Sequence, residues 1–206
     1  MEAPKRHHQV QGRDGRRRRR RRRRAEQNCG RQRWRAEADA AVEIEKAALV
    51  VAHARRLQAV RLVDFVLSDA DATRLAAAWA SAAPSLQSIQ LGGNNIGRAG
   101  AAAIAAALPA SVRVLGLERN SLGDAGAAEL AALLQRNDTL TLLDLSTNAI
   151  NAGGLLPLLD ALAANDAIQQ LDLRHNHIHE QNPALEPRWA VIGGEVPVRP
   201  RVRLRD

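Results

Sequence analysis

The feature that most constrains this chain of 206 residues is a segment that occurs four times, at a spacing of 26 or 28 residues. Each copy has apolar residues at its first, fourth and sixth positions, an asparagine at its ninth and an apolar residue at its eleventh. The asparagines are Asn94, Asn120, Asn148 and Asn176. Repeats of this length are typical of solenoids, because one unit cannot bury its apolar side alone and must stack on its neighbours.

The third copy shows which elements each unit should contain. Leucine alternates with polar residues over 143–146, which predicts a half-buried strand. Leucines recur at helical spacing over 155–162, which predicts a helix. A strand followed by a helix, repeated along the chain, gives parallel strands joined by helices. Pro157 is compatible with the predicted helix only in its first turn.

These positions fit the pattern L-x-x-L-x-L-x-x-N-x-L, and over about 62–178 the chain resembles the leucine-rich-repeat family. The longer unit with a G-x-x-x-L-x-x-x-L helix is similar to the ribonuclease-inhibitor-type subclass. The resemblance implies an α/β fold: a short solenoid with parallel strands on a concave face and helices on the convex face. Leu62, Phe65 and Leu67 are interpreted as a degenerate first unit, with Ala70 in the asparagine position.

We expect the asparagine row to be structural. The backbone turns just past each strand, and a buried N–H or C=O group without a partner is costly there. An amide side chain carries both a donor and an acceptor, so it can satisfy two such groups. Gly100, Gly126 and Gly154 start the predicted helices and are interpreted as positions of close approach, not as a phosphate loop.

The two parts of the chain that precede the repeats differ in composition. Residues 1–35 hold 15 Lys and Arg against 3 Asp and Glu and have almost nothing apolar to bury, which predicts a disordered basic tail. Residues 36–59 are rich in helix formers, with acids first and bases last, which predicts a capping helix at roughly 36–58. Val42 and Leu49 should face inward from this helix.

The repeats are expected over 60–180, and 181–206 should form a C-terminal cap or an extended basic tail. The last residues alternate apolar and basic side chains, which indicates an edge strand or an arm. Trp189, Val191 and Ile192 are candidates to cover the open end of the last repeat, because a solenoid end needs a cap.

Charge is distributed unevenly along the chain. Residues 36–187 hold 10 Lys and Arg against 17 Asp and Glu, so a mildly acidic body carries basic ends. The N-terminal arginine run has three interpretations. It could bind phosphates of nucleic acid, or it could be a signal for the nuclear import machinery. It could also be a low-complexity product of arginine-rich coding sequence, or an upstream extension that is not translated. The run comprises Arg16, Arg17, Arg18, Arg19, Arg20, Arg21, Arg22, Arg23 and Arg24.

The best candidate site is the concave face, on which partners of such repeats usually bind. Val114 and Leu142 are apolar neighbours that have no burial role in the pattern. Asp144 and Asp172 should lie on adjacent strands, where a solvated face is favoured over an acid/base pair. The candidate contact residues are Gln90, Val114, Glu118, Arg119, Leu142, Asp144, Gln170, Asp172, Arg174 and His175.

Nothing in the sequence predicts a catalytic, cofactor or metal site. His175, His177 and His179 alternate and could ligate a metal, but the repeat places them at exposed positions and no cysteine accompanies them. Cys29 lies among arginines that could activate it, but it is interpreted as an incidental thiol. No membrane span or secretory h-region is found, so an intracellular protein, cytoplasmic or nuclear, is expected.

The sequence therefore predicts a non-catalytic scaffold that binds another protein through the concave face. Two alternatives stay open. The chain could act on nucleic acid or in the nucleus through its arginine run, or it could regulate a small GTPase, since the repeat frame is similar to that of Ran-GTPase-activating proteins. Resemblance of the frame carries over no functional residue to this chain.

Overall fold

The computed structural model describes residues 45, 47–49, 56–82, 85–178 and 201–203. All of them belong to one unit of the chain, Ile44–Asp206. No helix among these residues is long and apolar enough to cross a membrane. The predicted basic tail, residues 1–35, lies outside the described residues, as do Val42, Trp189, Val191 and Ile192.

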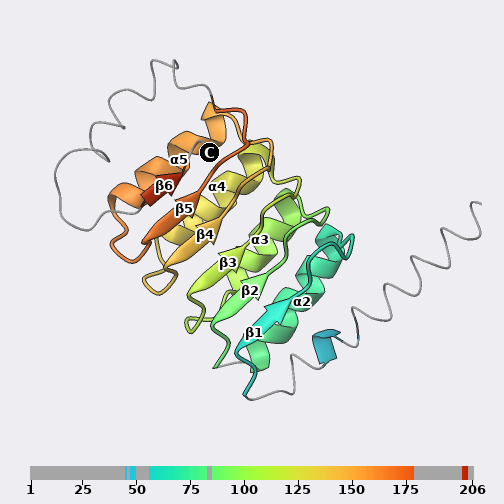
Figure 1. The fold of residues 1–206 in the computed structure, drawn as a ribbon. Helices are drawn as coiled ribbons and strands as arrows, with labels where there is room; N and C mark the ends of the chain where they lie inside the picture. The colour runs from blue at the N-terminus through green and yellow to red at the C-terminus, as the bar shows by residue number, and fades with distance from the viewer. Residues whose placement is uncertain (1–44, 46, 50–55, 83–84, 179–200, 204–206) are drawn as a thin grey trace, which may run out of the picture. The chain divides into compact units, whose positions relative to one another are not determined.

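Strands and helices alternate along the chain and form two layers (Figure 1). The six strands form one parallel sheet in chain order, and the helices pack on one side of it. The strands are β1 Ala59–Arg61, β2 Ser88–Gln90, β3 Val114–Gly116, β4 Leu142–Asp144, β5 Gln170–Asp172 and β6 Arg201–Arg203. The helices are α2 Asp69–Ala82, α3 Arg98–Ala107, α4 Gly123–Leu134 and α5 Ala152–Ala163.

The core lies between the two layers and is built from the repeated apolar positions. The central residue of each strand from β1 to β5 points into it, and these residues pair in register across the sheet: Val60, Ile89, Leu115, Leu143 and Leu171. Helix residues at equivalent positions, Ile104, Leu130 and Leu158, are fully buried against them. Each repeat unit therefore buries its apolar side only because a neighbouring unit stacks on it.

The first unit differs from its predicted alignment. Val60 pairs with Ile89, so Leu62 takes the place of Leu91 and Phe65 takes the place of Asn94. Ala70 lies in helix α2 and does not occupy the asparagine position. The prediction followed the spacing of leucines, whereas the register is set by burial of Val60, which a β-branched residue in a short strand favours.

Two predictions about helices were wrong. Pro157 lies in the second turn of α5 and not in its first, so the helix lacks one backbone hydrogen bond there. Residues 45 and 47–49 are helical and Arg56 lies in a turn, and residues 50–55 between them lie outside the described residues. Ala47 and Ala48 pack on the core, whereas Leu49 is 61% exposed and does not face inward.

The C-terminal prediction of an edge strand is confirmed for residues 201–203. These residues form β6, which pairs in parallel with β5 at the end of the sheet. The register places Arg201 beside Gln170 and Arg203 beside Asp172.

Candidate functional site

Side chains that point away from the helices form straight rows across the sheet, because neighbouring strands pair with equivalent residues opposite each other. We call this surface the strand face. Its first row is Ser88, Val114, Leu142 and Gln170. Its second row is Gln90, Gly116, Asp144 and Asp172. Its third row, two residues further along each strand, is Gly92, Glu118, Ser146 and Arg174.

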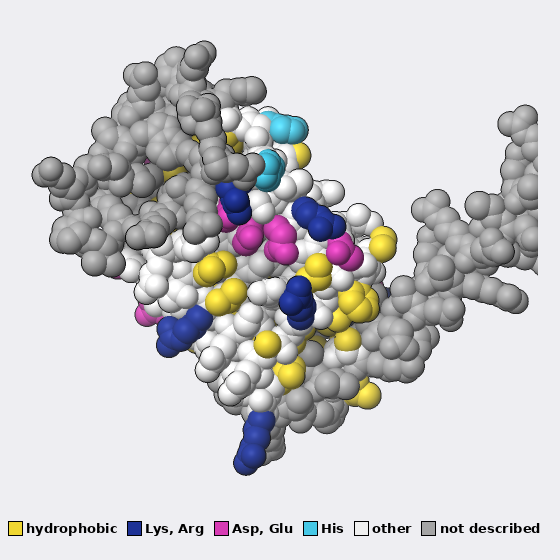
Figure 2. Space-filling model, in the orientation of Figure 1, with side chains coloured by type: hydrophobic (Ala, Val, Ile, Leu, Met, Phe, Trp, Pro, Cys, Tyr) yellow, Lys and Arg dark blue, Asp and Glu magenta, His cyan; other side chains and the backbone are white. Residues whose placement is uncertain are grey.

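Apolar and charged side chains meet near the middle of the strand face (Figure 2). Val114 and Leu142 are directly opposite each other on β3 and β4, and both are half-buried although they point away from the core. Such a pair contributes nothing to the packing between sheet and helices. Its partial exposure instead leaves apolar area available for contact with another molecule.

Glu118, in the third row, bends back over the sheet toward the second row. A methyl group at Gly92 would collide with its carboxylate, and a methyl group at Gly116 would lie 3.0 Å from its Oε2 atom. The carboxylate therefore occupies space that two glycines leave open. Burial raises the pKa of Glu118, and the negative charge of Asp144 adds to this effect. The Glu118 backbone N–H, Arg119 and Arg61 act in the opposite direction.

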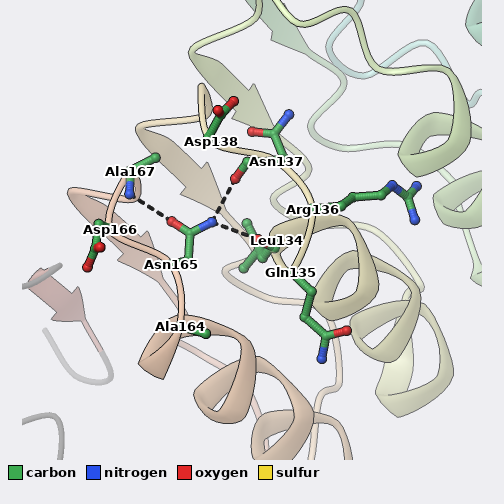
Figure 3. A pocket seen from close by; sticks show the side chains of 9 residues that line it. All are labelled: Leu134, Gln135, Arg136, Asn137, Asp138, Ala164, Asn165, Asp166 and Ala167. Atoms are coloured by element: carbon green, nitrogen blue, oxygen red, sulfur yellow. Dashed lines mark hydrogen bonds between the residues drawn. The ribbon is translucent and has the colours of Figure 1, made fainter.

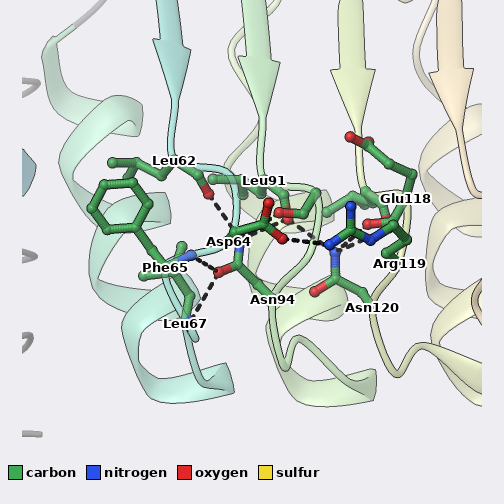
Figure 4. A network of polar contacts seen from close by, with 11 residues as sticks. Leu62, Asp64, Phe65, Leu67, Leu91, Asn94, Glu118, Arg119 and Asn120 are labelled. Carbon is green, nitrogen blue, oxygen red and sulfur yellow. Dashed lines mark hydrogen bonds and ion pairs between the residues drawn. The ribbon is translucent and has the colours of Figure 1, made fainter.

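The remaining charges of the strand face are held in pairs. Arg119 reaches across Gly93 to Asp64, with 2.6 Å between Nη2 and Oδ1 (Figure 4). Arg174 binds both carboxylate oxygens of Asp172, at 2.9 to 3.1 Å. Both arginines are therefore neutralised within the protein, although their side chains remain partly exposed.

Asp172 departs from the predicted set of contact residues because it is only 3% exposed. Its Oδ1 atom also accepts the backbone N–H of Arg174, and Asp144 accepts the backbone N–H and hydroxyl of Ser146 in the same way. Each aspartate therefore stabilises the turn that follows its own strand. The other predicted residues retain solvent access: Gln90, Val114, Glu118, Arg119, Leu142, Asp144, Gln170, Arg174 and His175.

The four asparagines form a ladder that links each unit to the one before it. Asn94 accepts the N–H groups of Phe65 and Leu67 at 3.0 Å, and its Nδ2 donates to Leu62 and Leu91 at 2.8 Å (Figure 4). Asn120, Asn148 and Asn176 bond backbone groups in the same pattern. The amides are fully used by the backbone, as the spacing leads one to expect, which leaves them no chemical role.

A second row of unusual backbone lies where each strand ends. Asp64, Gly93, Arg119, Thr147 and His175 occupy equivalent positions, and all have φ between 54° and 67°. A left-handed conformation is uncommon for residues other than glycine and persists only when the surroundings fix it. The asparagine ladder on one side and the strand on the other provide that constraint. The loops that border the strand face are therefore held in one shape.

Phe65 and Val66 are exposed residues that the sequence analysis missed. Phe65 is 48% exposed and Val66 is 70% exposed, and they follow β1 at the same edge of the sheet as Glu118 and Arg119. Phe65 is the only phenylalanine of the chain and was assigned to a buried position in the repeat. Phe65 takes the place of an asparagine in the first unit, and its ring points outward (Figure 4).

A hollow of about 470 Å³ lies at the opposite edge of the sheet, between the turns that follow α4 and α5 (Figure 3). Asn165 lines this hollow. Its side chain donates to the carbonyls of Leu134 and Asn137 and accepts the N–H groups of Ala167 and Ile168. These hydrogen bonds connect the turn after α5 to the turn after α4, so the Asn165 side chain links two neighbouring units. The 28-residue spacing of Asn137 and Asn165 was the signal that could have revealed this second link.

The histidines show no metal-binding arrangement within the part of the chain that the structure describes. His175 and His177 are exposed, and no group of three or more His, Cys, Asp or Glu side chains there could hold a metal ion. His179 and Cys29 lie outside the described residues.

Comparison with known proteins agrees with this architecture. The family model for the leucine-rich repeat matches residues 82–105 and 136–159. Among solved structures, actin-binding site 2 of leiomodin-1 superposes with a TM-score of 0.59 at 17% identity, over 69% of this chain and 83% of that one. The C-terminal domain of tropomodulin from Caenorhabditis elegans gives 0.57 at 15% identity, over 70% and 87%. A comparison with curated proteins finds no match.

At these identities, the similarity of this chain to the leiomodin-1 and tropomodulin domains shows a common fold and nothing more. The subclass of repeat stays a prediction. The matched repeats, the parallel sheet with helices on one side and the asparagine ladder lead to one conclusion: the chain has a leucine-rich-repeat fold.

Proposed function

We propose that this protein is a non-catalytic scaffold that binds another protein through its strand face. The observation that supports the proposal is the pair Val114 and Leu142: two apolar side chains in register and half-exposed, on the same face as the Glu118 and Asp144 carboxylates. The pair stabilises the sheet only by its own cross-strand contact, whereas an interface uses a small apolar centre with a polar surround.

The mechanism that we propose is passive presentation. The ladder and the left-handed loops hold the strand face in one conformation, so little backbone order is lost when a partner binds. Phe65 and Val66, at the edge of the same surface, add an exposed aromatic anchor, a residue type that interfaces favour. Specificity in this arrangement comes from the side chains at fixed spacing and not from a moving segment.

Replacement of the apolar pair tests this proposal. We would introduce the double substitution Val114→Ser and Leu142→Ser into the full chain. The proteins that this variant captures from a native lysate are then compared with those captured by the unchanged chain. The matched control is Ala128→Ser with Ala132→Ser, which alters two exposed positions of α4 on the helix side. Purified actin is the first defined partner to assay, because leiomodin-1 contributes an actin-binding site of similar fold.

The proposal predicts that a partner retained by the unchanged chain and by the α4 control is lost from the strand-face variant. Far-UV circular dichroism must show that all three proteins are folded alike. A partner that both variants retain equally would contradict binding through the strand face. Failure of actin alone would exclude that candidate and leave the assay of the lysate as the deciding result.

We also propose a second candidate function, binding of nucleic acid through the arginine run, supported by nine consecutive arginines at 16–24. Contacts of that kind act on phosphates, so affinity should fall steeply and linearly in log–log form as salt increases. Replacement of the nine arginines by glutamine should abolish this binding in the full chain. A salt-insensitive affinity, or one that survives the replacement, would count against it.

A further inference from the structure

The strand face carries an arrangement that points to the chemistry of its partner. On β3 and β4, the row after the apolar pair Val114 and Leu142 holds Gly116 and Asp144, and Glu118 lies in the row beyond it. Gly116, opposite Asp144, has no side chain, and the Glu118 carboxylate bends back over it. The two carboxylates therefore lie on one side of an apolar platform, with a floor of bare backbone between neighbouring strands.

Neither of these carboxylates is neutralised within the described part of the chain. Arg119 forms an ion pair with Asp64, and Arg174 forms one with Asp172. Arg61 of β1 lowers the pKa of Glu118 by its charge but forms no ion pair with it. No lysine or arginine of the described residues forms an ion pair with Glu118 or Asp144. Asp144 accepts two hydrogen bonds from Ser146, and these leave its second oxygen, Oδ2, open.

The surroundings of Glu118 also disfavour its ionised form when no cation is paired with it. Its pKa is raised first by burial and also by the charge of Asp144, which shows that solvent does not fully compensate the carboxylate. An external cation placed beside it would replace the lost hydration. An arginine or lysine also has an aliphatic stem of the length needed to cover neighbouring apolar residues while its charged end stays polar.

We propose that the strand face binds a basic segment of its protein partner: the stem of an arginine or lysine lies over Val114 and Leu142, and its cationic group lies between Glu118 and Asp144. This inference rests on the proposed function, since it names the partner chemistry of the same surface. Charge complementarity selects the occupant. A neutral or acidic segment would leave the two carboxylates covered and unpaired, which interfaces disfavour.

The test uses the full chain and a defined probe, a fluorescein-labelled peptide in which leucine alternates with arginine. Two further peptides carry citrulline, a neutral isostere of arginine, or glutamate in its place. Fluorescence anisotropy at about 150 mM salt, which screens long-range attraction, gives each Kd. The protein variants are Glu118→Gln, Asp144→Asn and the control Asp138→Asn, which removes an equal charge from an exposed turn away from the strand face.

The arginine peptide should bind the unchanged chain about tenfold more tightly than the citrulline peptide, and the glutamate peptide should bind least. Glu118→Gln and Asp144→Asn should each reduce that preference about fivefold, and Asp138→Asn should leave it within about twofold. Both substitutions keep an oxygen acceptor at the position, so local turns survive. The arginine run of the full chain is the same in every protein compared.

Equal binding of the arginine and citrulline peptides, no binding of the arginine peptide, or equal effects of Glu118→Gln and Asp138→Asn would each overturn the inference. The double variant Val114→Ser and Leu142→Ser distinguishes failure of this inference from failure of the proposed function. If it loses the lysate partner while the carboxylate variants keep it, the strand face binds a partner but not through a cation. If it loses nothing, the proposed function itself fails.

Discussion

At the scale of single residues, the asparagines and Glu118 show two opposite ways of handling a buried polar group. Asn148 is fully buried, and its amide bonds the backbone of its own unit and of the unit before it. Glu118 is half-buried and forms no ion pair with a described residue. The first arrangement stabilises the fold, whereas the second leaves interaction energy that a partner can use.

Replacement of Asn148 by alanine should destabilise the protein by about 2–4 kcal/mol, because it leaves buried backbone groups of two units without partners. Chemical denaturation followed by far-UV circular dichroism measures the free energy of unfolding. Asn95→Ala, at an exposed position next to the same ladder, is the control and should change it by less than about 0.5 kcal/mol. Equal effects of the two substitutions would contradict the role of the ladder.

Replacement of Glu118 by glutamine should have an effect on stability that depends on pH. The pKa of Glu118 is raised above the ordinary value of 4.5, so the folded state holds the proton to higher pH than the unfolded state. The ionised carboxylate therefore lowers the free energy of unfolding as pH rises from about 4.5 through the folded-state pKa. The glutamine variant lacks this loss.

Denaturation at pH 4 and pH 7 checks the sign. The variant should match the unchanged chain at pH 4 and be more stable at pH 7, by less than about 1 kcal/mol because solvent still screens the carboxylate. A variant that is less stable at pH 7 would show that Glu118 serves the fold. A gain in stability together with weaker binding would instead mark it as a residue retained for recognition.

At the scale of elements, contacts between successive helices decide where glycine is required. Asp69, in the first turn of α2, accepts the backbone N–H groups of Gly97 and Gly100 at the start of the next helix. Asp124 in α4 likewise accepts the N–H of Asn151 at the start of α5. The starts of α3 and α5 are thus capped by the preceding unit, and at Gly154 the backbone of that unit comes so close that a side chain does not fit.

Gly154→Ala should destabilise the protein by more than about 2 kcal/mol, because the new methyl group would lie 2.7 Å from the Cα atom of Asp124, a backbone atom that cannot move alone. Gly153→Ala is the matched control. Its methyl group would meet only the end of the flexible Asp124 side chain, and alanine favours the helix, so the change should be within about 1 kcal/mol. Thermal unfolding of both variants provides the comparison, and a Gly153 variant that is the less stable one would refute the account.

At the scale of the whole described unit, stability is carried by nearest neighbours. Units in the middle of the sheet are covered on both sides, whereas β1 and β6 form its ends. Phe65 also ends the asparagine ladder in the first unit. In a quasi-one-dimensional array each unit is stabilised mainly by the two that it contacts.

Amide hydrogen exchange should therefore be slowest in β3 and β4 and fastest in β1 and β6, since units at the ends open without disturbing the middle. Mass spectrometry of the native full chain at neutral pH measures this directly. Uniform protection across all six strands would show that the array opens only as one cooperative body. Fastest exchange in β3 or β4 would show that the stacking account is wrong.

The repeat frame could be predicted because a spacing of 26 to 28 residues leaves few ways to bury the apolar positions. It determined the alternation of strand and helix, the ladder of Asn94 to Asn176 and the rows of the strand face. The alignment of the first unit, the place of Pro157 in α5 and the exposure of Leu49 could not be obtained that way, because they depend on which neighbouring surface is present.

The candidate site, too, could be predicted from the sequence only in part. Composition and register by themselves determined that Val114 and Leu142 lie side by side on the strand face. Only the tertiary structure decided that Asp172 is buried with Arg174, that Phe65 is exposed, and that Glu118 bends over Gly116 beside Asp144. The physical reason is that a repeat fixes the backbone position of each residue, whereas charge pairing and burial depend on side chains from three different units.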